Sequence, residues 1–245
     1  MIPKIIHYCW FGGNPLPELA IRCINSWKKY LPEYEIKEWN EDNFDVNIIP
    51  YTKEAYENKK YAFVSDYARF WILYHYGGVY FDTDVEVIKP MDSIIQKAPY
   101  MGCETLASSA SGIRVAPGLG LAAPANLNLY SEILDFYSSL KFVVDGKQNL
   151  TTIVEITTGI LKEKGLVNID EIQEIEGIRI YPAEYFAARD IAEFTIPQTE
   201  NSYSIHYYAG SWKSKNHHLK FKILNLFPNS WVRLLVRFKR FILRR

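Results

Sequence analysis

The sequence GGVYFDTDVEV, residues 77–87, places two aspartates in an otherwise apolar segment that is predicted to form a buried strand. A buried carboxylate is costly unless it is paired or binds a metal. In a strand, residues two apart point to the same face, roughly 6.5 to 7 Å apart along the chain. Asp82 and Asp84 should therefore project together, and paired carboxylates are suitable oxygen ligands for Mg²⁺ or Mn²⁺.

The segment before this strand, residues 62–78, has the sequence AFVSDYARFWILYHYGG and predicts a helix that Gly77 and Gly78 close as its C-cap. Asp66 and Arg69 are three residues apart on it, so both can reach one ligand. A carboxylate beside a guanidinium accepts a hydrogen bond from one hydroxyl and donates to another. The pair is therefore a candidate polyol site, and an ordinary helical ion pair is the alternative.

The remaining pattern predicts an α/β protein with a mainly parallel, doubly wound sheet. Residues 3–13 and 34–40 are typical of strands, and residues 17–32 have helical spacing up to Pro32. Strands that alternate with helices indicate parallel pairing, and ligands then bind beyond the carboxyl ends of the strands. Residues 128–140 and 151–164 are predicted helices, and residues 202–212 a late strand and turn. No repeat or low-complexity linker divides the chain, which indicates one catalytic-sized domain.

Composition is that of a globular protein, with 48% hydrophobic and 23% charged residues. Aromatic residues make up 15%, which suits the stacking of bases or sugars. The three cysteines are widely spaced and form neither a zinc motif nor a disulfide framework, so a reducing cytoplasm is expected. The apolar run at the N-terminus is too short for a signal peptide or a membrane span.

The net charge of zero conceals an acidic body and a basic tail. Residues 201–245 contain ten Lys or Arg and no Asp or Glu, which leaves residues 1–200 with 18 basic and 28 acidic residues. At helical spacing, the apolar and basic residues of 228–245 fall on different faces, which is typical of an amphipathic helix on an anionic bilayer. A C-terminal helix packed on the domain is the alternative. No nucleic-acid partner is expected, because no stacking platform accompanies the charge.

Several blocks of the sequence resemble the glycosyltransferase family 32 group, and also the catalytic domains of the large clostridial glucosylating toxins. The longest is residues 64–86, VSDYARFWILYHYGGVYFDTDVE, with an S-D-x-x-R helix, a Y-G-G turn and a D-x-D strand. PKIIHYCWFGG at 3–13 is similar to the family's first strand, and IHYYAGSW at 205–212 to its C-terminal H-x-x-x-G-S-W segment. The resemblance implies a GT-A fold, with residues 1–212 as the glycosyltransferase domain and 213–245 as a separate tail.

The resemblance also implies roles for individual residues in donor binding. Trp10 would stack on the nucleotide base, although a core role is the alternative for a tryptophan on a buried strand. Asp66 and Arg69 would hold the hydroxyls of the transferred sugar. Tyr80, just before the D-x-D, would lie near the sugar or the diphosphate.

Further residues are implied around the metal and the diphosphate. Asp84 would be the main metal ligand, and Asp82 would contact both the ribose and the ion. His206 is a candidate third ligand, although the toxins have a glutamate in that region and a structural histidine is the alternative. Ser211 and Trp212 would close over the diphosphate.

Four other positions are less specific. His7 is expected to be structural, and Ser65 is expected to cap its helix or bond back to it. Glu104 could face either the acceptor or solvent. The TTG at 157–159 resembles a family loop on the acceptor side, but Ile160 replaces the proline often found there.

The function implied is retaining, metal-dependent transfer of a hexose from a nucleotide sugar, with Mn²⁺ or Mg²⁺ as cofactor. UDP-glucose or UDP-galactose is favoured as donor, and GDP-mannose is the alternative. The acceptor would be a glycan or lipid-linked oligosaccharide of surface polysaccharides such as capsule or lipopolysaccharide. A cytoplasmic enzyme bound peripherally to the inner face of the cell membrane is expected.

Three other classes of protein are alternatives to a glycosyltransferase. A haloacid-dehalogenase-type phosphatase also has D-x-D after a strand, but here FDTDVEVIKP continues as strand. A glycosidase would place its two carboxylates on either side of the scissile bond, about 5 to 9.5 Å apart. A catalytically silent, membrane-peripheral binding protein would have no reason to keep Trp10, Asp66, Arg69, Asp82 and Asp84 together.

Overall fold

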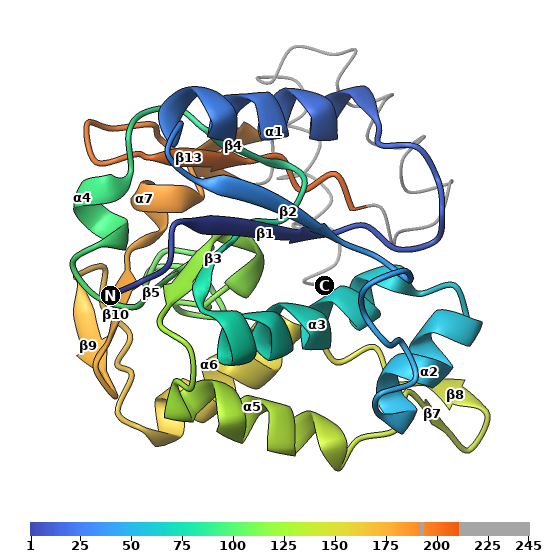
Figure 1. Cartoon of the computed structure of the whole chain (residues 1–245). Helices are drawn as coiled ribbons and strands as arrows, with labels where there is room; N and C mark the ends of the chain where they lie inside the picture. Colours follow the sequence, from blue (N-terminus) through green and yellow to red (C-terminus); the bar gives the residue numbers. More distant parts are fainter. Residues whose placement is uncertain (192–193, 211–245) are drawn as a thin grey trace.

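The computed structural model describes residues 1–191 and 194–210, and a seven-stranded sheet forms its centre (Figure 1). The strands of this sheet are β1 (Ile5–Cys9), β2 (Glu35–Trp39), β3 (Gly78–Tyr80), β5 (Tyr100–Gly102), β6 (Leu121–Ala123), β9 (Gln173–Ile175) and β10 (Ile178–Tyr181). Their order across the sheet is β2-β1-β3-β6-β5-β10-β9.

Five of these strands run in one direction. β1 pairs in parallel with β2 and β3, and β5 with β10. β6 is antiparallel to both β3 and β5, and β9 is antiparallel to β10. The predicted α/β class with a mainly parallel sheet is therefore confirmed. The carboxyl ends of β1, β3 and β5 lie at the same edge, where ligands of such sheets bind.

Helices cover both faces of the sheet, as Figure 1 shows. The helices are α1 (Glu18–Tyr30), α2 (Pro50–Glu57), α3 (Tyr61–Tyr76), α4 (Asp92–Ile95), α5 (Asn128–Ser138), α6 (Ile153–Glu163) and α7 (Ala183–Phe186), with a 3₁₀ turn η1 (Pro117–Leu119). α1 lies on one side, whereas α3, α5 and α6 lie on the other. The helices predicted at 17–32, 62–78, 128–140 and 151–164 are confirmed as α1, α3, α5 and α6.

Short strand pairs complete the fold. They are β4 (Val85–Val87) with β13 (Ser204–His206), β7 (Val143–Val144) with β8 (Lys147–Gln148), and β11 (Arg189–Ile191) with β12 (Phe194–Ile196). β13 confirms the predicted late strand. It pairs antiparallel with β4, so that His206 is opposite Val85. This pairing brings the end of the described chain to the D-x-D segment.

The prediction that a single strand carries both aspartates is wrong. β3 ends at Tyr80 and β4 begins at Val85, and the intervening residues form a turn in which the Val85 amide donates to the Asp82 carbonyl at 3.0 Å. The turn replaces the alternation of a strand, so side-chain direction at Asp82 and Asp84 is set by tertiary contacts instead. The two carboxylates do converge, but not for the reason that strand periodicity gives.

The junction between α3 and β3 explains why two glycines precede the strand. The Gly77 amide donates to the Leu73 carbonyl at 2.9 Å with φ at 62°, which is the left-handed conformation that glycine adopts readily. Gly78 has φ at 108°, and a Cβ there would lie 2.7 Å from the Ile5 carbonyl oxygen. β3 can therefore approach β1 closely, directly after the helix.

Several expectations fall on residues that the structure does not describe. Ser211, Trp212 and the whole basic tail, residues 213–245, lie outside the described residues. Within the described ranges, no helix combines the length and the apolar character that crossing a membrane requires. The division into a domain of residues 1–212 and a separate tail stays a prediction.

His7 lies in the sheet and has the structural place that the sequence analysis expected. It is 1% exposed, Trp39 Nε1 donates to its Nδ1 at 3.0 Å, and its Nε2 lies 3.0 Å from the Gly77 carbonyl oxygen. These contacts fit a neutral ring, because Nδ1 accepts while Nε2 donates. Burial lowers the pKa of His7 from 6.5 to about 4.

We expect this histidine to make folding stability depend on pH. The unfolded chain takes up the proton first as pH falls, because the folded pKa is the lower one. Stability is therefore fully present above pH 6.5 and falls by ~3 kcal/mol down to about pH 4. Urea unfolding of wild type and His7→Gln at pH 7 and pH 4 measures this loss. The matched control is His75→Gln on an exposed part of α3. An equal pH dependence in wild type and His7→Gln would contradict the prediction.

Candidate active site

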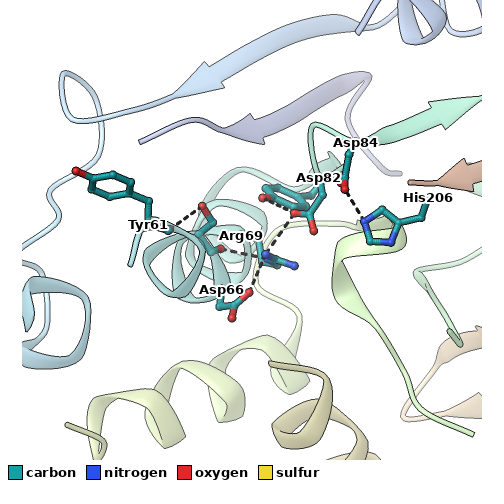
Figure 2. Close-up of polar contacts among 8 residues, drawn as sticks. Tyr61, Asp66, Arg69, Asp82, Asp84 and His206 are labelled. Carbon is teal, nitrogen blue, oxygen red and sulfur yellow. Dashed lines mark hydrogen bonds and ion pairs between the residues drawn. The ribbon is translucent and has the colours of Figure 1, made fainter. Parts of the chain in front are cut away.

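A continuous group of charged side chains lies at the carboxyl edge of β1 and β3. Figure 2 shows Asp66, Arg69, Asp82, Asp84 and His206 following one another from α3, through the turn after β3, to β13. The sequence positions of these residues span from 66 to 206, so the fold rather than local sequence brings them together. The group has two halves, one centred on Arg69 and one on Asp84.

Arg69 joins the helix to the D-x-D turn. Its Nη2 lies 2.8 Å from Asp66 Oδ1 and 3.3 Å from Asp82 Oδ1, and its Nε donates to the Ser65 carbonyl at 3.1 Å. The guanidinium also lies over the Tyr80 ring, 5.0 Å from its centroid. The residue is 3% exposed. Its charge is therefore buried but shared by two carboxylates, as a buried cation requires.

Asp66 lies between Arg69 and the N-terminus of α6. Its carboxylate accepts a hydrogen bond from the Ile153 amide, the first residue of that helix. Thr152 and Glu155 form a capping box there, so the helix begins at a defined residue. Burial raises the pKa of Asp66 to about 7, while Arg69 opposes this shift.

Asp82 contacts groups from three parts of the chain. Its Oδ1 accepts from the Tyr80 hydroxyl at 3.1 Å and pairs with Arg69, and its amide donates to the Gly118 carbonyl at 3.2 Å. Burial raises the pKa of Asp82, Arg69 opposes this, and the neighbouring Asp84 adds to it. The side chain retains 28% exposure, so one part of the carboxylate faces outward.

Gly118 makes room for this carboxylate. A Cβ at that position would lie 2.1 Å from Asp82 Oδ2 and 3.3 Å from Arg69 Nη1. Contacts below about 3.0 Å do not occur, so any side chain there would displace Asp82. The glycine is in the η1 turn, whose carbonyl also holds the Asp82 amide.

We expect Gly118→Ala to weaken the site without unfolding the protein. Because its methyl group displaces the Asp82 carboxylate, affinity for Mn²⁺ and release of nucleoside diphosphate from a nucleotide sugar should each fall at least about tenfold. The control is Gly159→Ala in α6, where a Cβ meets nothing within 4 Å. It should keep activity and gain slightly in stability, because alanine is the better helix former. Wild-type metal affinity in Gly118→Ala would contradict the prediction.

Asp84 and His206 form the other half of the site. His206 Nε2 lies 3.0 Å from Asp84 Oδ1, and the Ala209 amide donates to Asp84 Oδ2 at 2.7 Å. Burial alone would raise the pKa of Asp84, but His206 and these hydrogen bonds hold it below its ordinary value. Burial likewise opposes the charged form of His206, yet Asp84 raises the pKa of His206. The pair thus favours an ionised carboxylate at Asp84.

Asp82, Asp84 and His206 fit a divalent cation. Each offers one ligand atom, and these three atoms lie within 4.8 Å of one another. Two carboxylates and an imidazole are donors that Mn²⁺ accepts, and the carboxylates also suit Mg²⁺. The missing Cβ of Gly118 keeps space at Asp82 Oδ2, which supports the same interpretation.

Trp10 and Tyr80 occupy different settings near this edge. Trp10 directly follows β1, is half-buried, and donates from Nε1 to the Asn14 carbonyl at 2.6 Å. Tyr80 is 1% exposed and contacts Asp82 and Arg69, so its described contacts orient the other site residues. The donor roles given to both residues stay predictions.

Three of the less specific expectations have a structural answer. Ser65 Oγ donates to the Tyr61 carbonyl at 3.2 Å, so it does bond back within its helix. The expectation that residues 157–159 form a loop is wrong, because they lie inside α6, where Thr157 and Thr158 are buried. Glu104 follows β5 and pairs with Arg114 at 3.5 Å.

Sequence patterns did not reveal three contributors to the site. Gly118, the Ile153 amide and the Ala209 amide each contact a site carboxylate. The amides are backbone groups and carry no residue signature. No residue pattern around Gly118 links it to Asp82.

Comparison with protein families covers the part of the site that lies on α3 and in the D-x-D turn, but not His206. Residues 17–101 match the family model described as "Glycosyltransferase sugar-binding region containing DXD motif". Schizosaccharomyces pombe inositol phosphoceramide mannosyltransferase 1 is 34% identical over 111 residues, or 41% of this chain and 33% of that protein. Saccharomyces cerevisiae mannosyl phosphorylinositol ceramide synthase CSH1 is 27% identical over 105 residues, or 41% and 28%. The matched region thus spans about a third of these relatives' length.

Solved structures share the fold. The structure of PaToxG glycosyltransferase matches this chain with a TM-score of 0.50 at 20% identity. The match covers 67% of this chain and 70% of the PaToxG chain. A glycosyltransferase involved in glycosylation of the major capsid of PBCV-1 has a TM-score of 0.50 at 10% identity and covers 89% and 100%. The predicted GT-A fold is confirmed, as is the resemblance to DXD-containing glycosyltransferases.

Proposed function

We propose that this protein is a metal-dependent glycosyltransferase that moves a hexose from a nucleotide sugar to a glycan or lipid-linked acceptor. The contact between the candidate sugar-binding pair and the candidate metal-ligand set supports this proposal most directly. Arg69, which pairs with Asp66, also pairs with Asp82 of the metal-ligand set at 3.3 Å. In a nucleotide sugar, the sugar is attached directly to the diphosphate, so a sugar-binding pair next to a metal-ligand set matches the two parts of the donor.

Different residues would bind different parts of the donor. Asp66 and Arg69 would hold sugar hydroxyls, because their carboxylate and guanidinium offer complementary acceptors and donors. Asp82, Asp84 and His206 would hold Mn²⁺ or Mg²⁺, with Asp82 also reaching the ribose. When bound there, the ion would supply Lewis-acid assistance and neutralise the charge of the departing diphosphate. Trp10 would stack on the base, with Tyr80, Ser211 and Trp212 around the sugar and diphosphate.

The site fits metal binding better than it fits the chemistry of a glycosidase. A glycosidase needs one carboxylic acid as a proton donor on the leaving side of the scissile bond. Here Asp84 is kept ionised by His206 and by the Ala209 amide, and Asp82 is paired with Arg69. Asp84 is therefore not set up as a general acid, and the Asp82 carboxylate is already engaged by a guanidinium. Retention of configuration is carried over from the resemblance, and the anomeric configuration of the product tests it.

The donor has two candidates. The toxin-like blocks favour UDP-glucose or UDP-galactose. The sequence relatives, which include an inositol phosphoceramide mannosyltransferase, favour mannose and hence GDP-mannose. Release of nucleoside diphosphate from UDP-glucose, UDP-galactose and GDP-mannose, each with Mn²⁺ and with chelator, distinguishes them. We expect one donor to be hydrolysed only with the metal, and no metal-dependent hydrolysis of any donor would contradict the proposal.

The cellular setting is proposed from the tail. Its basic, amphipathic pattern at residues 228–245 supports peripheral binding to an anionic membrane, on the inner face of the cell membrane. A lipid-linked acceptor of surface polysaccharide synthesis would be presented there. Sedimentation with anionic vesicles, with and without residues 228–245, checks this part, and equal partition of both chains would contradict it.

A further inference from the structure

A second carboxylate–guanidinium pair lies beyond the carboxyl end of β5. Glu104 Oε1 is 3.5 Å from Arg114 Nε, and the two side chains are 17% and 32% exposed. The pair repeats the chemistry of Asp66 and Arg69 but is more open to solvent, since the Arg69 side chain is only 4% exposed. A partly exposed pair of this kind can still receive a ligand.

The backbone holds this second pair in a fixed position. The Glu104 amide donates to the Arg114 carbonyl at 2.8 Å, and Cys103 and Val115 form a β-bridge. Thr105 Oγ1 donates to the Gly112 carbonyl at 2.8 Å and closes the intervening loop. The pair is thus at the base of a closed loop, which fixes the backbone positions of both residues.

The second pair and the metal-ligand set lie at the same edge of the sheet. β5 runs in the direction of β3, so Glu104 is at the sheet edge that carries Asp82. Burial lowers the pKa of His206, whereas Asp84, then Asp82 and then Glu104 raise it. Arg114 begins the segment that leads to Gly118, whose carbonyl accepts from the Asp82 amide. Glu104 and Arg114 are therefore placed near the ligand set.

We propose that Glu104 and Arg114 bind hydroxyls of a polyol acceptor, a sugar or a cyclitol. This inference rests on the proposed function, because an acceptor has meaning only for a transferase. The Glu104 carboxylate would accept from one hydroxyl and the Arg114 guanidinium would donate to its neighbour. Arg114 also acts on Glu155, whose pKa it helps to lower, so the guanidinium is balanced by acidic groups and favours a neutral polyol over an anion.

The competing explanation is that the pair only braces the loop. A partly exposed ion pair of this kind contributes little to stability, so its loss would leave folding almost unchanged. Binding and kinetics separate the two explanations, whereas stability does not. Arg114→Gln provides a second variant that removes the other partner and keeps the test informative if Glu104→Gln folds poorly.

The experiment uses the full chain and two probe acceptors, myo-inositol and methyl α-mannoside. Probe binding is followed by saturation-transfer NMR, and transfer is followed as the ratio of glycosylated probe to hydrolysed donor. We expect Glu104→Gln and Arg114→Gln to lower both the binding signal and this ratio about tenfold. The matched control is Glu132→Gln, which removes an ion pair to Lys164 on the surface of α5 and α6. It should behave as wild type.

The outcomes for the two proposals differ. Wild-type probe binding in both Glu104→Gln and Arg114→Gln, or no binding of either probe to the wild type, overturns the acceptor inference. If no nucleotide sugar is hydrolysed, the proposed function is wrong. Probe binding that depends on Glu104 would in that case still identify a polyol site. If hydrolysis is normal and the transfer ratio is insensitive to both substitutions, only the acceptor inference is lost.

Discussion

Arg69→Met is expected to lower the free energy of unfolding by about 3 to 5 kcal/mol. Arg69 is the shared partner of Asp66 and Asp82, at 2.8 and 3.3 Å, and its side chain is 4% exposed. Without the guanidinium, two carboxylates would remain beside each other with no cation in contact. The pKa of each would rise, because burial would no longer be opposed by a positive charge.

This mechanism predicts how the loss depends on pH. Protonation relieves an unpaired carboxylate, so the destabilisation should be larger at pH 8 than at pH 5. Urea unfolding at the two pH values measures it. Arg22→Met is the matched control, because it removes an exposed arginine whose Nε lies 3.7 Å from Glu86. It should change stability by less than about 1 kcal/mol. Equal losses in both variants would contradict the account of Arg69 as a buried charge.

The helical half of the site could be predicted from the sequence because its geometry is local. Asp66 and Arg69 are three residues apart in α3, and the helix ends at Gly77, as its capping pattern predicts. Their mutual contact follows from helical spacing alone. The existence of the main helices and strands was predictable for a related reason, since hydrophobic periodicity reports which face of an element is buried.

The metal half depends on contacts that local pattern does not contain. Asp82 and Asp84 converge through a turn, which an apolar run of β-forming residues concealed. Asp84 and His206 are 122 positions apart in the sequence, and they meet only because β13 pairs with β4. Gly118 and the Ala209 amide act through shape and backbone direction. The family resemblance made His206 a candidate ligand, and the antiparallel pairing of β13 with β4 places it beside Asp84.

Asp84→Asn is expected to reduce metal-dependent hydrolysis of the nucleotide sugar at least about a hundredfold. The substitution preserves the shape of the side chain but removes the charge that His206 and the Ala209 amide hold in place. A neutral amide is a weak ligand for a hard cation, and the charge balance at the diphosphate would be lost. Stability should fall rather than rise, because folding favours the ionised form of Asp84 and the substitution leaves His206 without its charged partner.

Steady-state release of nucleoside diphosphate measures this loss. Glu86→Gln is the matched control, because it makes the same change of charge two residues away, in β4, where Glu86 pairs with the surface residue Arg22. Its activity should remain within about twofold of wild type. If Glu86→Gln lost as much activity as Asp84→Asn, the effect would come from net charge rather than from the ligand set.

Direct titration of Mn²⁺ tests the central claim, that Asp82, Asp84 and His206 bind a divalent cation for nucleotide-sugar chemistry. Free Mn²⁺ is counted by electron paramagnetic resonance in the presence of the nucleoside diphosphate that the donor panel selects, or of UDP and GDP in turn. The account predicts one bound ion per wild-type chain and affinity at least about tenfold weaker in Asp84→Asn and His206→Ala. Equal Mn²⁺ affinity in the wild type and both variants would contradict it.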